Sequence, residues 1–412
     1  MSRWTLIALA TAAIAGVAAI QLLSVSPESI APSGQAEFVP SSGLPSVRVL
    51  LGDVSRERFS LRIDGPYRVL GEDQWSIVAQ GHKLGETSVE AEPEGIRIGE
   101  RDFPAPRLSI EVQRDGDLWV DDRRYRGSLQ LIRRDDGPLS VVNVVPVEDY
   151  VASVLPSEMP ADFPLAAQQA QAIVARSFVL YQMKTTGENR DYDVFDSQRS
   201  QAYGGMQYVA DSGRALAVES AASRRVIDQT RGMVLVYGDR LFCTYYAAVC
   251  GDHTLRGSDV FGDAAPPLVG VACVDCSDAP RYRWRQELLR EQFEPKLRDY
   301  LVRIGEDVGQ IRSIHSAVDD PARLPQVIVR GNQAEAQVSS VNFRLYVLGA
   351  ADAASARYEL KLDGDRLDVH GRGWGHSVGL CQWGARGRAE RGHDCHQILG
   401  HYYPGSELRV LE

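Results

Sequence analysis

The stretch VLPSEMPADFPLAAQQAQAIVARSF, residues 154–178, joins two segments that both have helical character. Before it, residues 146–155 begin with a proline and two acidic residues, which suit the first turn of a helix. After it, apolar and small residues recur at helical spacing and predict a second helix from about 162–164 to 184. Because a residue that precedes proline is disfavoured in a helix, we expect the first helix to end before Pro156. Glu158 would then lie in a short connection between Pro156 and Pro160.

A glutamate in such a corner has two interpretations. It can be an exposed residue of a turn, which is the simpler reading. Alternatively, the flanking prolines limit its backbone freedom and aim the carboxylate at a ligand. A partly buried glutamate, with its pKa raised from about 4.3, can act as a general acid and then as a general base.

Composition excludes one class of partner. The chain has 412 residues, 44% of them hydrophobic and 24% charged, with a formal net charge of -10. This is an ordinary globular composition with room for two or more domains. Without a basic excess to neutralise phosphates, nucleic acid is not expected as the main partner.

The N-terminus is an apolar segment from Trp4 to Val25 after a single positive residue, Arg3. Residues 1–25 are long enough for a membrane anchor and equally suit a cleaved signal peptide. Residues 26–45 form a polar linker rich in Ser, Pro, Ala and Gly. Both readings predict export to a periplasmic or other extracytoplasmic location, with membrane contact only through this segment.

The remaining chain predicts an α+β fold. Short alternating runs separated by Gly, Asp and Pro make residues 46–140 a β-rich domain. Residues 141–412 mix helices and strands, with an inserted helix and strands at about 280–350. We expect a helix at 284–304 broken near Pro295, a strand pair turning at Gly238–Asp239, a strand at 342–349, and two short helices in the tail.

Two short-spaced ligand pairs predict a metal site. CGDH supplies Cys250 and His253, and CVDC supplies Cys273 and Cys276. Together they make a Cys3His set typical of structural zinc, closed by four protein ligands and therefore not catalytic. The alternatives are disulfides, or cysteines buried as small hydrophobic residues. Cys243, Cys381 and Cys395 have no assigned role.

The tail motif GRGWGHSVGLCQWGA contains a second candidate site. It is neither a phosphate loop nor a dinucleotide fingerprint. His376, with Gln382 and Trp383 nearby, suits a sugar-binding wall, whereas the alternative is a packed turn in which His376 bonds main chain. A Cys381–His376 nucleophile and base is disfavoured, because a spacing of five residues points the two side chains to different faces of a helix.

Four ordered motifs resemble the SpoIID/LytB family of bacterial cell-wall proteins. They are VVNVVPVEDYVASVLPSEMP, AAQQAQAIVARSFVL, DSQRSQAYGG and GRGWGHSVGLCQWGARGRAERGHDCHQILGHYYPG, and together they run from about Val141 to the C-terminus. The family typically shows an EMP motif, SQVYGG and GHGVGMSQYGA. Here Ser377 replaces a glycine, Leu380-Cys381 replaces Met-Ser, and Ser177-Phe178 replaces Thr-Tyr.

The resemblance implies a lytic transglycosylase that cleaves peptidoglycan glycan strands, with Glu158 of the EMP motif as a single acid/base. It implies that substrate contacts come from the matching motifs, at Arg176, Ser177, Gln201, Tyr203, His376, Gln382 and Trp383. Asp196 is a possible second carboxylate with a structural role as the favoured reading. Other members of the family enhance an N-acetylmuramoyl-L-alanine amidase, so a non-catalytic, peptidoglycan-binding enhancer with an amidase partner is the alternative. A zinc hydrolase is a third reading, opposed by the four candidate protein ligands.

Overall fold

The computed structural model describes residues 36–37, 45–52, 55–113, 116–135, 137–187 and 190–411. The predicted signal or anchor segment at 1–25 and most of the predicted linker lie outside the described residues. The chain divides into two compact units. We call residues 36–163, 171–235 and 408–412 the N-terminal unit, and residues 164–170 and 236–407 the C-terminal unit. The fold is α+β, as predicted, with its β-rich part at the N-terminal side.

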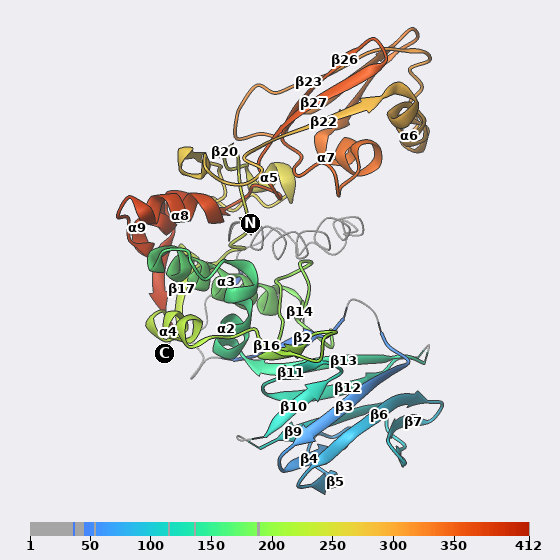
Figure 1. Ribbon diagram of the computed structural model, residues 1–412, viewed down its shortest axis with the longest axis vertical. Coiled ribbons are helices and arrows are strands. Elements are labelled where there is room, and N and C mark those ends of the chain that lie inside the picture. The colour runs from blue at the N-terminus through green and yellow to red at the C-terminus, as the bar shows by residue number, and fades with distance from the viewer. Residues whose placement is uncertain are drawn as a thin grey trace. The chain divides into compact units, whose positions relative to one another are not determined.

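Two large sheets dominate the N-terminal unit. One has the order β16-β15-β11-β10-β3-β6-β7-β8, and the other β14-β2-β13-β12-β9-β4-β5 (Figure 1). The strands of the unit are β1 (Ala36–Glu37), β2 (Ser46–Leu50), β3 (Arg58–Asp64), β4 (Tyr67–Leu70), β5 (Ile77–Gly81), β6 (Leu84–Glu92), β7 (Gly95–Ile98), β8 (Arg101–Phe103), β9 (Arg107–Val112), β10 (Asp117–Val120), β11 (Arg123–Tyr125), β12 (Ser128–Arg133), β13 (Leu139–Pro146), β14 (Val194–Phe195), β15 (Gln207–Val209) and β16 (Ala215–Ala217).

Alternating side chains along these strands form the core. In β3, every second residue from Phe59 to Ile63 is buried, whereas the residues between them are partly exposed. This is the period-two pattern that the sequence predicts for strands with one buried face. The predicted boundary at residue 140 falls inside β13, which pairs with both β12 and β2. The strands of the β-rich region therefore belong to one unit together with residues 141–163 and 171–235.

Helices α2 (Val147–Glu158) and α3 (Leu165–Thr185) follow β13, and α4 (Ala221–Gln229) follows β16. Every residue of α3 from Gln171 to Tyr181 is buried. A helix surrounded on all sides by protein needs small residues for close packing, and the alanines of this segment supply them. The prediction for the second helix is confirmed to within a few residues.

The predicted corner around Glu158 is wrong in one respect. Helix α2 does not stop before Pro156 but continues through it to Glu158. Pro156 lacks the amide hydrogen for one helical bond, yet it lies in the last turn, where the loss of a single bond is tolerated. Met159 N–H donates to the Leu155 carbonyl at 3.0 Å and closes that turn. Glu158 is thus the last residue of a helix.

A six-stranded sheet forms the main layer of the C-terminal unit, in the order β22-β27-β26-β23-β24-β25. Helices α6 and α7 pack against it and share one core with it (Figure 1). Its strands are β22 (Arg283–Leu289), β23 (Ile311–Ala317), β24 (Gln326–Gly331), β25 (Glu335–Ser339), β26 (Tyr358–Asp363) and β27 (Arg366–Arg372), and its helices are α6 (Arg290–Arg303), α7 (Ser340–Phe343) and the π-helical turn η4 (Arg344–Leu348).

Two predicted elements of this unit are wrong. The predicted helix at 284–304 begins as strand β22, which alternates in exposure and pairs with β27. Its remaining two thirds are helix α6. The predicted strand at 342–349 is α7 and η4. Short apolar runs suit either element, and the packing of α7 and η4 into the core decides the outcome here.

Shorter elements complete the chain. They are β17 (Met233–Tyr237), β18 (Arg240–Leu241), β19 (Tyr246–Ala247), β20 (Asp252–His253), α5 (Gly257–Val260), β21 (Ala272–Cys273), the 3-10 turn η3 (Val274–Cys276), β28 (Leu380–Cys381), α8 (Gln382–Glu390), α9 (Cys395–Tyr402) and β29 (Glu407–Val410). The β17–β18 hairpin and the two tail helices confirm their predictions. Among the described residues, no helix is both long and apolar enough to span a membrane.

Candidate functional site

Glu158 is held by a loop that lies far from it in sequence. Its Oε1 accepts a hydrogen bond of 2.7 Å from the amide of Ala202, in the QAYGG segment that follows β14. The side chain is half-buried at the end of α2. A backbone amide is a rigid donor, so it orients the carboxylate without the entropy cost of ordering a second side chain.

The two residues that flank Ala202 anchor this loop. Gln201 is fully buried, and its Nε2 donates to the carbonyl of Ala175 in α3. Tyr203 is also buried, and its hydroxyl donates to Asn143 Oδ1 at 2.7 Å. Because both flanking side chains are bonded inside the protein, the loop that carries the Ala202 amide is held in place. We expected Gln201 and Tyr203 to touch substrate, but the structure places both inside the protein, where they position the loop.

Asn143, in strand β13, holds the Tyr203 hydroxyl in place. Its Nδ2 donates to the carbonyls of Arg126 and Ser128 at 2.8 and 2.9 Å, which orients its Oδ1 toward Tyr203. Burial raises the pKa of Tyr203 well above the ordinary value of a tyrosine. Its hydroxyl therefore keeps its proton and acts as the donor of this bond.

Asp196 is the second carboxylate of this region. Its Oδ2 accepts a hydrogen bond of 2.9 Å from the amide of Gly52, between β2 and β3. Its backbone is also paired, since its amide donates to Leu50 and its carbonyl accepts from Tyr203. These bonds join the loop to strand β2, which agrees with a structural role.

Arg176 and Ser177 lie in the core, where Arg176 contacts the first turn of α2. Both are fully buried. Arg176 forms a two-pronged ion pair with Glu148 of α2, with N–O distances of 3.0 and 2.7 Å, and also donates to the Met233 carbonyl. Burial lowers the pKa of Arg176, whereas the Glu148 carboxylate opposes that shift.

Ser177 joins α3 to β17. Its hydroxyl donates to the Ile173 carbonyl and accepts from the Leu235 amide, both at 2.8 Å. The expected substrate contacts by Arg176 and Ser177 are therefore not supported, because the protein already surrounds both side chains. They link α2, α3 and β17 and thereby support the helix that carries Glu158.

His376 belongs to the C-terminal unit and lies among aromatic rings. The ring of Phe261 meets it edge-on at a centroid distance of 5.0 Å, and Tyr245 does so at 6.1 Å. His376 Nδ1 accepts from the Val378 amide at 3.0 Å, which leaves the proton on Nε2 in the neutral ring. Burial lowers the pKa of His376 to about 4, so the ring is neutral at pH 7.

The residues after His376 form a tight turn. Ser377 has φ of 62°, in the left-handed region where glycine is favoured, which gives a physical reason for the glycine of the family's motif. Gln382 is buried at the start of α8, and Trp383 is half-buried with the guanidinium of Arg386 4.9 Å from its ring centroid. Of the predicted wall residues, His376 and Trp383 thus retain some exposure.

The predicted metal site differs from the cysteine cluster of the structure in one residue, because Cys381 takes the place of His253. Among the described residues, four buried cysteines have sulfur atoms within 4.8 Å of one another, and they are Cys250, Cys273, Cys276 and Cys381. His253 is outside this group. In the β20–β21 ladder His253 is opposite Ala272, while Cys273 is opposite Asp252, so His253 and Cys273 project from opposite faces.

The geometry of this cysteine cluster fits a tetrahedral metal. The sulfurs of Cys250 and Cys276 are 3.7 Å apart, which is longer than a disulfide bond of about 2.05 Å. It matches the edge of about 3.8 Å that a tetrahedron with Zn–S bonds of about 2.3 Å requires. All four cysteines are free thiols. The donor set is therefore suited to zinc, with every coordination position taken by protein.

Surrounding groups support the sulfurs. The amides of Cys250 and Gly384 each approach Cys381 Sγ to 3.3 Å, and the Tyr402 hydroxyl lies 3.1 Å from Cys273 Sγ. A side chain on Gly384 would collide with Cys273 Sγ, since its Cβ would lie 2.5 Å away. Such outer contacts orient metal ligands and stabilise their charged form.

The charges of the thiols also favour a cation. Burial raises the pKa of the Cys250 and Cys381 thiols. Hydrogen bonds from the neighbouring thiols, Cys250 first, lower the pKa of the Cys276 thiol. Metal ligands must be deprotonated, and a divalent cation would let all four sulfurs bind as thiolates.

Sequence reasoning missed Cys381 because it lies 105 positions after Cys276. The available signal was its replacement of a serine in the family's tail motif. Its membership of the cluster also removes support for a Cys381–His376 nucleophile. Cys243, which is buried, and Cys395, which is half-buried, are outside the cluster.

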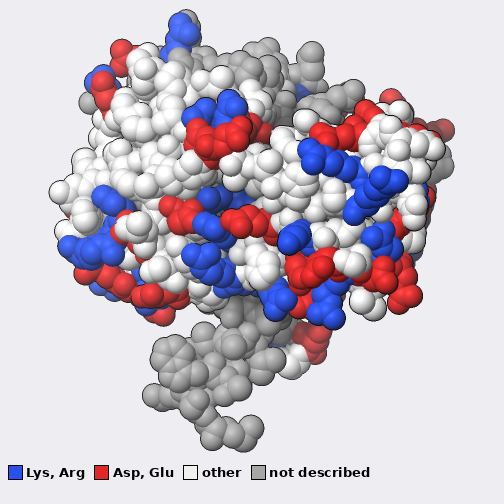
Figure 2. Space-filling view, turned by 90° about the horizontal axis from the view of Figure 1, so that it is seen from above, with Lys and Arg blue, Asp and Glu red and all other residues white. Residues whose placement is uncertain are grey.

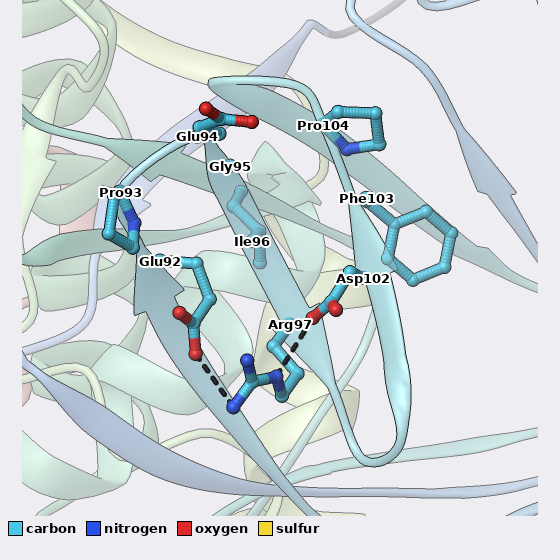
Figure 3. Close-up of a pocket in the computed structure, with 9 residues that line it drawn as sticks. All are labelled: Glu92, Pro93, Glu94, Gly95, Ile96, Arg97, Asp102, Phe103 and Pro104. Carbon is cyan, nitrogen blue, oxygen red and sulfur yellow. Dashed lines mark hydrogen bonds and ion pairs between the residues drawn. The ribbon is translucent and has the colours of Figure 1, made fainter.

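Two surface hollows lie apart in sequence from these residues. Figure 3 shows one of about 370 Å³ at β6–β8, where Arg97 is paired with both Glu92 and Asp102. The other, of about 640 Å³, is lined by residues of α5, β24 and β25 in the C-terminal unit. On the face in Figure 2, acidic and basic side chains are intermixed in small groups. We assign no function to either hollow.

Comparison with known proteins identifies a family to which this chain is similar. The sequence profile of SpoIID, described as Stage II sporulation protein, matches residues 135–237, which include α2, α3 and the Ala202 loop. An uncharacterized protein of Brachyspira hyodysenteriae (strain ATCC 49526 / WA1) is 31% identical over 362 residues, 88% of this chain and 92% of that protein.

Two further relatives have descriptive names. Stage II sporulation protein D of Bacillus amyloliquefaciens is 27% identical, over 65% of this chain and 75% of that protein. The Amidase enhancer of Bacillus subtilis (strain 168) is 25% identical, over 62% of this chain and 39% of that protein.

Proposed function

We propose, from the premise that the chain belongs to the SpoIID/LytB family, that it is a peptidoglycan lytic transglycosylase with Glu158 as its single acid/base. The observation that carries this proposal is the 2.7 Å bond from the Ala202 amide to Glu158 Oε1. This bond holds a half-buried carboxylate at the end of α2. The buried side chains of Gln201 and Tyr203 in turn hold the loop that donates the bond. An ordinary turn glutamate needs no such support.

The reaction needs only one carboxyl group. Glu158 protonates the oxygen that links N-acetylmuramic acid to N-acetylglucosamine, and the bond from that oxygen to the anomeric carbon breaks. The resulting carboxylate then accepts the proton of the muramic acid's own primary hydroxyl, whose oxygen bonds to the anomeric carbon. The product is an anhydro-muramic end, and no water is consumed. Hydrolytic glycosidases, in contrast, usually need two carboxylates.

The other site residues have roles in support. Gln201 and Tyr203 hold the Ala202 amide against Glu158, while Arg176 and Ser177 hold α3 against α2 and β17. In the C-terminal unit we propose that His376 and Trp383 bind sugar, because a neutral imidazole and an indole suit uncharged hydroxyls and ring faces. Gln382 is proposed to assist there through its amide.

The cysteine cluster is proposed to hold one structural zinc. Cys250, Cys273, Cys276 and Cys381 would bind it, and the closed set leaves no position for a reacting water. When bound, the ion would contribute stability to the C-terminal unit. The protein is proposed to act outside the cytoplasm on peptidoglycan strands.

The decisive experiment uses the protein from residue 46 onward and glycan strands stripped of peptides. Anhydro-muramic products, measured by mass, are expected with the wild type and not with Glu158→Gln. Full activity of Glu158→Gln would remove Glu158 from the mechanism. Absence of product from the wild type on several glycan substrates would contradict the enzyme.

A relative named Amidase enhancer supports a second candidate function. In that case this protein binds peptidoglycan without cleaving it and stimulates a cell-wall amidase. Stimulation of a purified amidase that persists in Glu158→Gln would favour this function over the enzyme.

A further inference from the structure

Tyr150 has a buried hydroxyl that the fold leaves unpaired. Its side chain is fully buried in α2. No other described residue forms a hydrogen bond with this hydroxyl. A buried polar group without a partner costs about 1–3 kcal/mol, so a native protein seldom keeps one without a use.

The ring of Tyr150 is placed by the loop that also holds Glu158. It stacks on Tyr203 with a centroid distance of 5.1 Å and an angle of 23°. Tyr203 cannot shift easily, because its hydroxyl is bonded to Asn143. The preceding residue, Ala202, donates to Glu158. Two neighbouring residues of one loop therefore contact the tyrosine ring and the carboxylate.

Charge around Tyr150 supports the same placement. Burial raises the pKa of Tyr150 well above its ordinary value, and the negative charges of Glu158 and then Asp196 raise it further. The hydroxyl is thus a hydrogen-bond donor throughout the working pH range. Asp196 is bonded by the Gly52 amide, while Glu158 is the carboxylate whose charge changes during the proposed reaction.

We propose that Tyr150 is a positioning residue for Glu158, and that its hydroxyl donates to the Glu158 carboxylate after that group has protonated the leaving sugar. The bond steadies the charged intermediate state until Glu158 accepts the next proton. No covalent bond or net proton transfer involves Tyr150. This inference rests on the proposed function for its catalytic consequence, but the proposed hydrogen bond between the two side chains can be tested separately.

The matched variants are Tyr150→Phe and Tyr203→Phe, which remove one hydroxyl each from the same stack. Tyr150→Phe removes an unpaired group, so its midpoint of denaturant unfolding should equal or exceed that of the wild type. Tyr203→Phe leaves Asn143 Oδ1 without its donor, so its midpoint should fall. We expect kcat of Tyr150→Phe on denuded glycan strands to fall about tenfold or more, with KM little changed.

A second measurement does not depend on activity. The side-chain carboxyl of Glu158 can be titrated by 13C NMR in protein labelled at glutamate, with Glu158→Gln to assign the signal. Loss of a donor to the charged form should raise the Glu158 pKa in Tyr150→Phe relative to the wild type. Other groups that act on Tyr150 and Glu158, namely Asp196 and Tyr203, are the same in both proteins.

The outcomes separate the two proposals. An unchanged Glu158 titration in Tyr150→Phe overturns the positioning role, whether or not the protein is an enzyme. So does full activity of Tyr150→Phe beside an inactive Glu158→Gln, which would leave the proposed function intact. A loss of activity that parallels a loss of stability also overturns it, since Tyr150 would then be structural. A raised Glu158 pKa in Tyr150→Phe, in a protein that does not cleave glycan, supports the proposed hydrogen bond and contradicts only the proposed function.

Discussion

The surroundings of Glu158 and the cysteine cluster hold their functional atoms by different means. Along α2 and the loop that bonds Glu158, many buried groups satisfy one another, since Arg176 pairs with Glu148 and Tyr203 with Asn143. In the cysteine cluster, four buried thiols face one another without opposite charge among them. In the first region most buried groups are paired with other protein groups, and the Tyr150 hydroxyl is an exception. The second region is chemically suited to a cation. The comparison teaches that similar burial of polar groups can serve as internal support or as a ligand set.

The largest expected effect is the loss of metal from the cysteine cluster. Cys381→Ser should lower bound zinc from about one equivalent per chain to almost none, because a tetrahedral thiolate set tolerates poorly the loss of a ligand. Zinc binding in small domains contributes on the order of 10 kcal/mol to folding, so the C-terminal unit should unfold far more readily. Metal analysis and thermal unfolding in reducing buffer measure both effects.

His253→Ala is the matched control for that variant. It changes a residue of the originally predicted ligand set that lies outside the cluster, so it should keep its zinc. If His253→Ala loses the metal and Cys381→Ser retains it, the proposed ligand set is wrong. Intact disulfides among the four cysteines would also contradict a zinc site.

The next effect concerns the buried ion pair between Arg176 and Glu148. Arg176→Met leaves Glu148 buried without its partner, which should reduce the free energy of unfolding by about 3–5 kcal/mol. Arg97→Ala removes two surface ion pairs from the same unit and should cost about 1 kcal/mol or less. Denaturant unfolding compares the two variants. Equal losses would mean that the buried pair is not the internal support described above.

The smallest of the three effects is a pH dependence from His376. Its pKa is about 4 in the folded protein and 6.5 in its ordinary state, so between these values the unfolded chain binds more protons. Stability therefore falls as the pH is lowered from 6.5 to 4, by on the order of 3 kcal/mol at most, and levels below that.

His376→Gln should lack this part of the slope. Because Glu158 and the cysteine cluster are unchanged in that variant, the difference between the two stability curves isolates His376. The measurement is the denaturation midpoint at several pH values from 4 to 7. Parallel curves for the wild type and His376→Gln would show that the ring is not buried as a neutral group.

Much of the fold could be predicted from local pattern. Strands with one buried face, such as β3, carry their alternation in the sequence, and the hairpin at Gly238–Asp239 is marked by its turn residues. Predictions failed where local preference was weak or overruled. Pro156 disfavours helix, yet the Met159 bond closes the last turn of α2. Likewise, residues 283–289 have a strand partner, β27, that no local pattern reveals.

Composition and short spacings are enough to predict the α+β class and three of the four clustered cysteines. Glu158 became the leading candidate through the resemblance of four ordered motifs to a family. Tertiary structure decided which side chains face inward. It turned Arg176, Ser177, Gln201 and Tyr203 from expected substrate contacts into buried supports, and it exchanged His253 for Cys381. The physical reason is that burial and ligand geometry depend on partners far away in the chain, such as Ala202 for Glu158 and Cys250 for Cys381.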